Sequence, residues 1–324
     1  MDLLNFDYVL PKELIAQTPI TQRDASRLMA VSDMAILHKK FTDIIDYFSE
    51  GDVLVLNDSK VFPAKLAGKK ETGGKVEILL LKQINKLKWE CLTRGKTSNK
   101  ILFGNITGTV QDNVISFSED IIPHLQQLGK TPLPPYIKSY TSLERYNTVY
   151  AEKEGSAAAP TAGLHFTPEL LKKIENKGVI VAKVTLHVGL GTFLPVKEQE
   201  IENHKMHSEF FSISKETADK INNRKGKLFV VGTTSIRALE SAAKDGKVLS
   251  MTGETSIFIY PGHKWKLNYA GIITNFHLPK SSLLMLVSAF LSRERIMEAY
   301  QEAIKERYRF YSFGDAMIIL SYSK

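Results

Sequence analysis

Three clusters of polar residues directly follow apolar segments of this sequence, and their side chains are of types that bind charged small molecules or move protons. The clusters are Thr185 and His187 before the turn at 189–192, residues 232–235 followed by Arg237 and Glu240, and residues 274–277 followed by Ser281 and Ser282. If the apolar segments are parallel strands, the clusters share one sheet edge, where α/β folds bind ligands. The N–H groups of a following helix then suit a carboxylate or phosphate. The hydroxyl residues could instead only cap helices, which fits Ser281 best.

A fourth candidate is the loop at 155–163, which consists almost entirely of small residues. A backbone without bulky side chains can approach a ligand closely. The loop leads to His165 and to a helix predicted over 168–177, which is followed by a strand predicted over 179–188 that carries His187 near its end. The two histidines would therefore lie beside glycine-rich loops at the edge of the site.

Six of the eight histidines follow residue 160, namely His165, His187, His204, His207, His263 and His277. A single histidine is more often a packed structural residue than a catalytic one, but two of the six together favour proton-transfer chemistry. His204 and His207 lie three residues apart, yet the sequence has no HExxH spacing and no cysteine near them. We therefore expect no metal site.

Several familiar motifs are absent from the sequence. Gly189 and Gly191 do not complete a dinucleotide fingerprint, because Leu194 stands at the third glycine position. No Walker lysine motif and no G-x-S-x-G motif occurs. Cys91 is the single cysteine, which excludes a disulfide framework and fits a reducing cytosol. The apolar run at 283–291 is too short to span a bilayer and the N-terminus lacks a signal-peptide pattern, so we expect a cytoplasmic protein.

From residue 150 onward, predicted strands and helices alternate. The predicted strands lie at 227–232, 257–260, 270–275 and 316–322, and the predicted helices at 235–243, 281–291 and 293–308. Together with a strand at 53–56, this alternation predicts a larger α/β domain with a mostly parallel, barrel-like sheet. If the last strand runs parallel to the others, Asp315 lies at the edge away from the site.

The segment at 61–149 has a different character, with many short β-type stretches separated by turns. The stretches are 75–81, 88–93, 100–103, 108–111 and 114–117, followed by a helix at 121–128 and a proline-rich connector at 132–135. Short strands at this spacing predict a small barrel or sandwich. We therefore predict a discontinuous α/β catalytic domain from 1–60 and 150–324, with an inserted small β-barrel at 61–149.

The net charge of +8 is concentrated in one segment. Residues 60–100 contain eleven lysines and arginines against three glutamates, whereas acids and bases balance in the rest of the chain. A concentrated basic surface attracts polyanions such as nucleic acid. Lysines along a solvated sheet edge that discourage aggregation are an equally good interpretation of the pattern.

Residues 308–315, YRFYSFGD, are dense in aromatic side chains. Such a patch could stack on a base or hold a sulfonium by cation–π attraction. Core packing of a C-terminal strand is the more natural role for Phe310 and Phe313.

Several longer motifs resemble one known family. They are NDSKVFPAKL at 57–66, PLPPYI at 132–137, YAEKEGSAAAPTAGLHFT at 150–167, VTLHVGLGTF at 184–193, HKMHSE at 204–209, VGTTSIRALES at 231–241, IFIYPG at 257–262, TNFHLPKSSLLMLVSAF at 274–290 and YRFYSFGDAM at 308–317. The chain resembles the S-adenosylmethionine:tRNA ribosyltransferase-isomerases of queuosine biosynthesis essentially from end to end.

The resemblance implies a specific reaction. Such enzymes transfer the ribosyl part of S-adenosylmethionine to 7-aminomethyl-7-deazaguanine at the tRNA wobble position and isomerise it, which gives epoxyqueuosine and releases adenine and methionine. The implied fold is an α/β domain with an inserted small β-barrel. The implied partners are tRNA and S-adenosylmethionine as co-substrate, with no further cofactor, metal or membrane, in the bacterial cytoplasm.

Within this reaction the sequence favours particular residues. We expect His165 and His187 to lie nearest the chemistry, with His277 and Glu209 as further catalytic candidates. The expected contacts to S-adenosylmethionine are Ala159, Pro160, Thr161, Gly163, Gly189, Gly191, Thr233, Thr234, Arg237 and Asn275. The expected phosphate contacts to tRNA are Lys60, Lys65, Lys69, Lys70 and Lys75.

Without the resemblance, two other functions fit the residues. One is an S-adenosylmethionine-dependent tRNA methyltransferase, although the incomplete glycine fingerprint speaks against its usual fold. The other is a non-catalytic RNA-binding protein, for which the basic segment would suffice. In that case the polar clusters at the strand ends would have no purpose.

Overall fold

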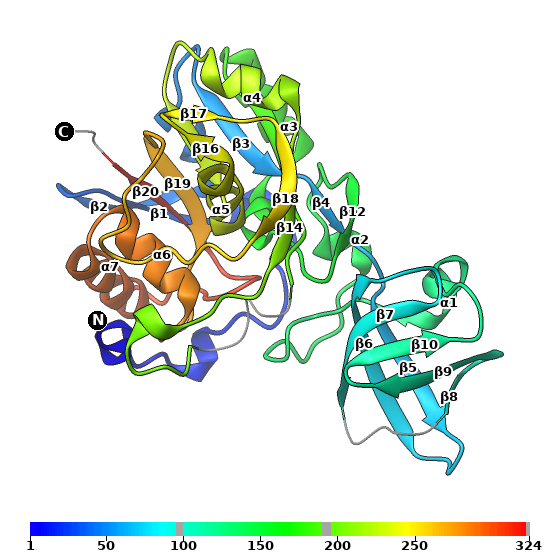
Figure 1. Ribbon diagram of the computed structural model, residues 1–324. Helices are drawn as coiled ribbons and strands as arrows, with labels where there is room; N and C mark the ends of the chain where they lie inside the picture. The colour runs from blue at the N-terminus through cyan, green and yellow to red at the C-terminus, as the bar shows by residue number, and fades with distance from the viewer. Residues whose placement is uncertain (95–99, 190–195, 322–324) are drawn as a thin grey trace.

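The computed structural model describes residues 1–94, 100–189 and 196–321. Figure 1 shows a larger body, in which helices surround a sheet, and a small β-barrel to one side of it. The paired strands β4 (Ser59–Val61) and β12 (Lys153–Ser156) lie between the two. The protein is thus a mixed α/β structure with a separate barrel.

The sheet of the larger body has nine strands in the order β18-β14-β13-β3-β15-β19-β20-β1-β2. Their bounds are β1 Arg27–Val31, β2 Ile36–Lys40, β3 Val53–Asn57, β13 Ile180–Leu186, β14 Glu209–Ile213, β15 Leu228–Val231, β18 Met251–Thr255, β19 Gly271–Asn275 and β20 Ala316–Leu320. The central strands β13, β3, β15 and β19 are mutually parallel. The carboxyl ends of β13, β15 and β19 therefore meet at one edge, as the polar clusters predicted.

The prediction of a mostly parallel, barrel-like sheet is not confirmed for the whole sheet. Four of the eight pairings are antiparallel, and among the described strands β18 and β2 end a linear order. Strand β20 runs antiparallel to β19 because two consecutive helices, α6 (Ser282–Phe290) and α7 (Arg293–Lys305), connect them. A single crossover helix would have carried the chain to the opposite edge, whereas the second helix brings it back.

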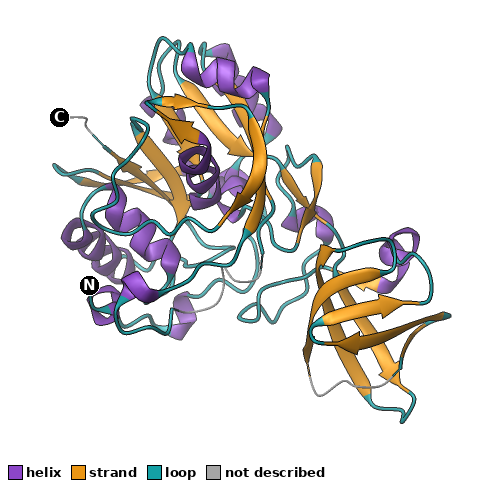
Figure 2. Ribbon diagram, in the orientation of Figure 1, coloured by secondary structure: helices purple, strands orange, loops and turns teal. Residues whose placement is uncertain are grey.

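Helices cover both faces of the sheet (Figure 2). Alternate strand residues pack on one face against α4 (Lys215–Asn222), α5 (Thr233–Ala242), α6 and α7. On the other face they pack against α3 (Pro168–Asn176) and the 3-10 helix η4 (Phe41–Tyr47). The predicted helix at 168–177 is confirmed, with Thr167 capping its start and Gly178 in the left-handed region after its end.

Some predicted elements were wrong or missing. Residues 257–260 form no strand, because β18 lies at 251–255 and the chain then enters a loop that buries Ile259. The strands β1, β2, β14 and β18 and the helix α4 were not predicted. Apolar residues of a buried loop produce the same local pattern as a strand, so periodicity does not separate the two.

The small barrel is closed. Strands β5 (Lys65–Lys70), β6 (Lys75–Gln83), β7 (Lys88–Arg94), β10 (Val114–Phe117), β9 (Ile106–Gln111) and β8 (Ile101–Phe103) pair in that order, and β8 pairs again with β5. The burial of β6 alternates along the strand, so one set of side chains fills the interior. The prediction of a small barrel in this part of the chain is confirmed.

Three short strands and two short α-helices lie outside these sheets or extend them. Strand β11 (Gly129–Lys130) adds to β5 of the barrel, and β16 (Ala243–Lys244) pairs with β17 (Lys247–Val248) after α5. Helix α1 (Leu125–Leu128) precedes β11. Residues 131–142, the connector, lead from the barrel to α2 (Leu143–Tyr146) and back toward the larger body.

Candidate active site

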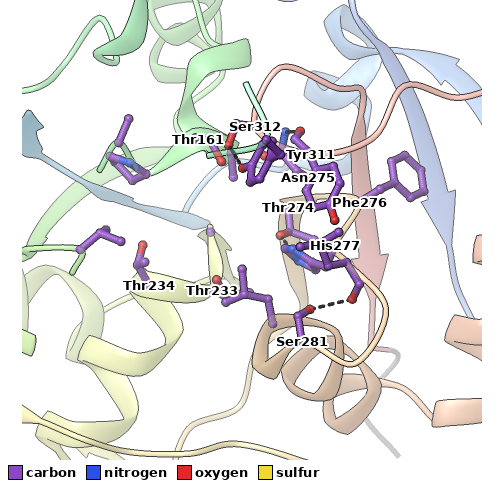
Figure 3. A pocket seen from close by; sticks show the side chains of 18 of the residues that line it. Thr161, Thr233, Thr234, Thr274, Asn275, Phe276, His277, Ser281, Tyr311 and Ser312 are labelled. Atoms are coloured by element: carbon purple, nitrogen blue, oxygen red, sulfur yellow. Dashed lines mark hydrogen bonds between the residues drawn. The ribbon is translucent and has the colours of Figure 1, made fainter. Parts of the chain in front are cut away.

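A pocket of about 780 Å³, including the space at its mouth, lies where β15 and β19 end. Figure 3 shows the lining side chains, which come from the small-residue loop, the two strand-end clusters, the connector and the C-terminal aromatic segment. The lining residues include Tyr136, Ala159, Pro160, Thr161, Gly232, Thr233, Thr234, Thr274, Asn275, Phe276, His277, Ser281, Tyr311 and Ser312.

The N-terminus of α5 forms one wall of the pocket. Gly232 precedes the helix with φ +85, a conformation that residues with a Cβ rarely adopt, and no side chain caps the helix. Thr233 and Thr234 follow and also line the pocket. The N–H groups of this first turn and the helix dipole make the wall suitable for a carboxylate.

Asn57, at the end of β3, holds this wall in place. Its Nδ2 donates to the Thr234 hydroxyl at 3.1 Å and to the Leu186 carbonyl at 3.0 Å. Its Oδ1 accepts from the N–H groups of Ser59 and Leu186, both at 3.1 Å. Asn57 is buried and was not singled out from the sequence, because an asparagine at a strand end carries no distinctive local signal.

His277 is the imidazole that the structure places in the pocket lining. Its Nε2 lies 2.9 Å from the Thr274 hydroxyl, and its backbone N–H donates to the Tyr300 hydroxyl at 2.8 Å. Burial lowers the pKa of His277 to about 3, so the ring is uncharged at neutral pH. An uncharged ring can receive a proton and does not repel a cationic ligand.

His165 lies behind the pocket wall, not in its lining. Its Nδ1 is 2.8 Å from the Ser26 hydroxyl, and its Nε2 is 3.3 Å from Nδ2 of Asn275. Burial first, and then the charges of nearby arginines, lower the pKa of His165 to about 3. The small-residue loop brings Ala159, Pro160 and Thr161 to the pocket, whereas Gly163 packs against Tyr150 behind it.

His187 lies just after β13, outside the pocket lining. Its ring stacks on Phe210 with a centroid distance of 5.3 Å, and a Cβ at Gly155 would lie 2.8 Å from its Nε2. Burial lowers the pKa of His187. Within the described part of the chain, its buried Nδ1 has no hydrogen-bond partner.

Glu209 and Arg237 form a buried ion pair, also outside the pocket lining. The second Glu209 oxygen accepts from the Gly189 N–H at 2.7 Å, so the pair fixes the start of the glycine-rich turn. Arg237 also donates to the Ile257 carbonyl. The predicted ligand residue Gly191 lies outside the described residues.

Aromatic side chains close the pocket from two distant parts of the chain. Tyr136 of the connector stacks on Tyr311 with a centroid distance of 4.5 Å, and its hydroxyl lies 2.6 Å from that of Ser312. Tyr311 has φ +74, a rare conformation for a residue with a side chain and one that occurs often at functional sites. Phe310 and Phe313 are buried in the core. The sequence indicated the aromatic segment, but not Tyr136.

Asp315 lies at the pocket edge of the sheet, since β20 begins beside the end of β19. Its carboxylate accepts from the N–H groups of Arg27 and Arg309, at 2.9 and 2.8 Å. Burial raises its pKa. These contacts indicate that Asp315 holds the segment that precedes β20.

The predicted tRNA lysines lie on β4 to β6. Lys60 is paired with Glu154 at 2.8 Å, and Lys65 with Glu77 at 3.0 Å. Lys69 and Lys75 are exposed and face each other across the β5–β6 register, next to Lys70. Three of the five positive charges therefore gather at one end of this hairpin.

The described residues contain no group of three or more histidine, cysteine, aspartate or glutamate side chains placed to hold a metal ion. They also contain no helix long and apolar enough to cross a membrane.

The sequence and the fold both match known proteins. The family model described as "Queuosine biosynthesis protein" matches residues 3–319. The S-adenosylmethionine:tRNA ribosyltransferase-isomerase of Desulforamulus reducens is 52% identical over 342 residues, covering 99% of this chain and all of that protein. Its counterpart from Clostridioides difficile is 53% identical over 341 residues, with 98% and 100% covered. The crystal structure of S-adenosylmethionine tRNA ribosyltransferase from Thermotoga maritima is 38% identical, with a TM-score of 0.58 over 98% of this chain and all of that one. The chain therefore belongs to the queuosine biosynthesis protein family.

Proposed function

We propose that this protein is an S-adenosylmethionine:tRNA ribosyltransferase-isomerase. It transfers the ribosyl part of S-adenosylmethionine to 7-aminomethyl-7-deazaguanine at the wobble position of tRNA and isomerises it, with release of adenine and methionine. The observation that carries the proposal is the pocket, which combines a helix N-terminus, an uncharged imidazole and an aromatic wall in a chain that matches the family along its length.

The pocket suits the two ends of S-adenosylmethionine. The methionine carboxylate lies at the N-terminus of α5, against Thr233 and Thr234. The small side chains of Ala159, Pro160 and Thr161 leave room for the ribose and adenine. Arg237, Gly163 and Gly189 support the surrounding loops instead of touching the ligand, because their contacts are with protein groups.

The proton chemistry belongs to the imidazole in the pocket. The proposed reaction removes a proton from the 5′ carbon beside the sulfonium, and a general base must reach that proton directly. His277 is the catalytic candidate that lines the pocket, and its neutral ring suits a cationic substrate. His187 and Glu209 lie outside the pocket lining, where Glu209 holds the turn at Gly189 and His187 packs on Phe210.

In this proposal the α/β part holds S-adenosylmethionine and the barrel contacts tRNA. We assign residues 1–60 and 150–324 to a catalytic α/β domain, and residues 61–149 to an inserted barrel domain. The basic hairpin of the barrel, with Lys69, Lys70 and Lys75, contacts tRNA phosphates. S-adenosylmethionine is the co-substrate, the proposal includes no further cofactor or metal, and the reaction takes place in the cytoplasm.

The test follows free adenine by chromatography. The protein is incubated with S-adenosylmethionine and tRNA that carries 7-aminomethyl-7-deazaguanine, and the same tRNA with an unmodified wobble guanine is the control. We expect adenine and methionine in equal amounts with the modified tRNA only. S-adenosylhomocysteine as the product would instead identify a methyltransferase, and tRNA binding with neither product would identify an RNA-binding protein.

A further inference from the structure

His165 is buried, and hydrogen bonds engage both of its ring nitrogens. The residue is 4% exposed and its ring packs on Phe41 with a centroid distance of 5.0 Å. It does not line the pocket, although Asn275, which lies between His165 and the pocket, does. A group that transfers a proton to or from the substrate must come within hydrogen-bond distance of it. His165 is therefore badly placed for that task but well placed to act on Asn275.

The hydrogen-bond directions in this chain of residues follow from the chemistry of their atoms. The Tyr311 carbonyl only accepts, so the atom of Asn275 that lies 3.0 Å from it is the donating Nδ2. The same Nδ2 contacts Nε2 of His165, which must then accept. Nδ1 consequently carries the ring hydrogen and donates to the Ser26 hydroxyl at 2.8 Å.

The surroundings of His165 keep the ring in the form that can accept. Burial, and after it the positive charges of Arg145, Arg23 and Arg309, lower the pKa of His165 to about 3. A charged ring would carry hydrogens on both nitrogens and would lose the contact to Asn275. The neutral ring therefore fixes which way the amide of Asn275 faces.

The oxygen atom of the Asn275 amide has no hydrogen-bond partner within the described residues. Oδ1 of Asn275 is buried, and no protein group there donates a hydrogen bond to it. Asn275 is 4% exposed and lines the pocket. Leaving a buried carbonyl oxygen without a hydrogen bond is unfavourable, so this atom is a natural acceptor for a ligand donor.

We propose that His165 is a positioning residue that holds the Asn275 side chain so that its Oδ1 accepts a hydrogen bond from the bound substrate. The inference rests on the proposed function, which supplies the ligand. In S-adenosylmethionine, the donors of this kind away from the amino-acid end are the adenine amino group and the ribose hydroxyls. Asn275 is then a specificity residue for one of these donors.

The test compares His165→Ala, His165→Gln, Asn275→Ala and the double variant His165→Ala/Asn275→Ala by adenine release. For His165→Ala we expect the KM for S-adenosylmethionine to rise about tenfold, kcat to fall much less, and the pH profile of kcat to keep its shape. The glutamine amide can accept from Asn275 and donate toward Ser26, so His165→Gln should recover most of the loss. The double variant should be no worse than Asn275→Ala, because the two residues act in series.

Other results would overturn the inference. A loss of kcat of a thousandfold at unchanged KM, together with loss of the acidic limb of the pH profile, would make His165 a general base. Additive losses in the double variant would show that the two residues act independently. Thermal unfolding checks that each variant folds. Ser26→Ala provides a milder change at the far end of the chain of hydrogen bonds, with a smaller rise in KM expected and an unchanged KM counting against the inference.

Substrate analogues identify the donor. Replacing the adenine 6-amino group by a carbonyl, or removing the ribose 2′-hydroxyl, should weaken binding to the wild type about tenfold for the correct donor, and should have little effect in Asn275→Ala. Equal losses in both proteins for both analogues would reject the proposed contact. Calorimetric binding of S-adenosylmethionine separates the two proposals, because wild-type binding without adenine release would refute only the proposed function.

Discussion

Arg237 illustrates how a side chain that looks like a ligand group can have a structural task. It lies one turn into α5, near the pocket, but its guanidinium is paired with Glu209 in a fully buried position. Glu209 in turn holds Gly189 through its backbone N–H. A buried pair of this kind contributes little net stability, yet removing one partner leaves a costly unpaired charge.

We therefore expect Arg237→Met to lower the free energy of unfolding by about 3–5 kcal/mol. Adding Glu209→Gln should restore most of this loss, because the remaining buried group is then neutral. Urea unfolding monitored by circular dichroism measures both effects. A loss below about 1 kcal/mol in the single variant would mean that water reaches the Glu209 carboxylate.

The buried imidazoles should make stability depend on pH. His165 and His277 have a folded pKa of about 3 against an ordinary value of 6.5, so the unfolded chain binds protons that the folded chain does not. The free energy of unfolding should therefore fall as the pH drops from 6.5 toward 3, by about 1.4 kcal/mol per pH unit for each histidine. Asp58 and Asp315, whose pKa values are raised in the fold, act in the opposite direction.

Comparison of wild type with His277→Gln isolates one histidine from these other groups. Between pH 6 and 4 the slope of unfolding free energy against pH should be shallower in the variant by about 1.4 kcal/mol per unit. Urea titrations at several pH values provide the slopes. Identical slopes would show that His277 already titrates in the folded protein near its ordinary pKa.

At the scale of elements, the connector at 131–142 ties the barrel to the pocket. It leaves the barrel after β11 and brings Tyr136 against Tyr311, while the Lys138 N–H donates to the Gln17 side chain at 3.1 Å. The chain enters the barrel from the larger body and runs back to that body when it leaves the barrel (Figure 1). The wall of the pocket thus depends on a segment that the sequence assigns to the inserted domain.

Tyr136→Ala should weaken the binding of S-adenosylmethionine about tenfold, because it removes an aromatic wall that is worth about 1.4 kcal/mol. Tyr140→Ala is the matched control, since Tyr140 lies on the same connector but is 80% exposed. Calorimetry should show normal binding for the control. Equal affinities for the two variants would exclude Tyr136 from the ligand site.

Strand β12 contains a glycine that also depends on close packing. Gly155 has φ +137 and lies directly against the His187 ring, whereas Gly246 has φ +76 and open space around it. Gly155→Ala should cost roughly 1–3 kcal/mol more than Gly246→Ala, since only the former adds a steric clash to the backbone strain. Chemical denaturation measures the difference. Equal costs would indicate that His187 moves aside freely.

At the scale of the whole molecule, charge and chemistry lie in different parts. The excess of positive charge is confined to residues 60–100, which include the barrel strands β5, β6 and β7, and the pocket lies in the larger body. Reversing Lys69, Lys70 and Lys75 to glutamate should therefore weaken tRNA binding more than tenfold at low salt and leave S-adenosylmethionine binding unchanged.

The salt dependence of tRNA binding provides a second measure of this prediction. Each lost phosphate contact should reduce the steepness of log affinity against log salt by about 0.7–0.9. Reversal of Lys172, Lys173 and Lys215, which are exposed on α3 and α4, is the charge-matched control. If both triple variants lose affinity equally, net charge alone would explain the effect.

Much of the fold could be predicted from the sequence, and the reasons are local. The alternation of apolar and polar residues predicted most barrel strands, and the burial of β6 alternates in the same way. Thr167 with Pro168 marked the start of helix α3, and Gly178 marked its end. The polar residues after β15 and β19 were correctly expected to share one edge, because consecutive α/β units place parallel strand ends together. The expected roles of the individual site residues stay predictions.

The sequence by itself therefore determined the family, the barrel and the strand-end clusters, since each depends on residues close together in the chain. The tertiary structure decided which of those residues meet. It placed His277 in the pocket and His165 behind it, reversed β20 so that Asp315 reached the pocket edge, and brought Tyr136 to Tyr311. These placements depend on the order of the strands and on contacts between residues more than a hundred positions apart. A local pattern of side chains encodes neither of them.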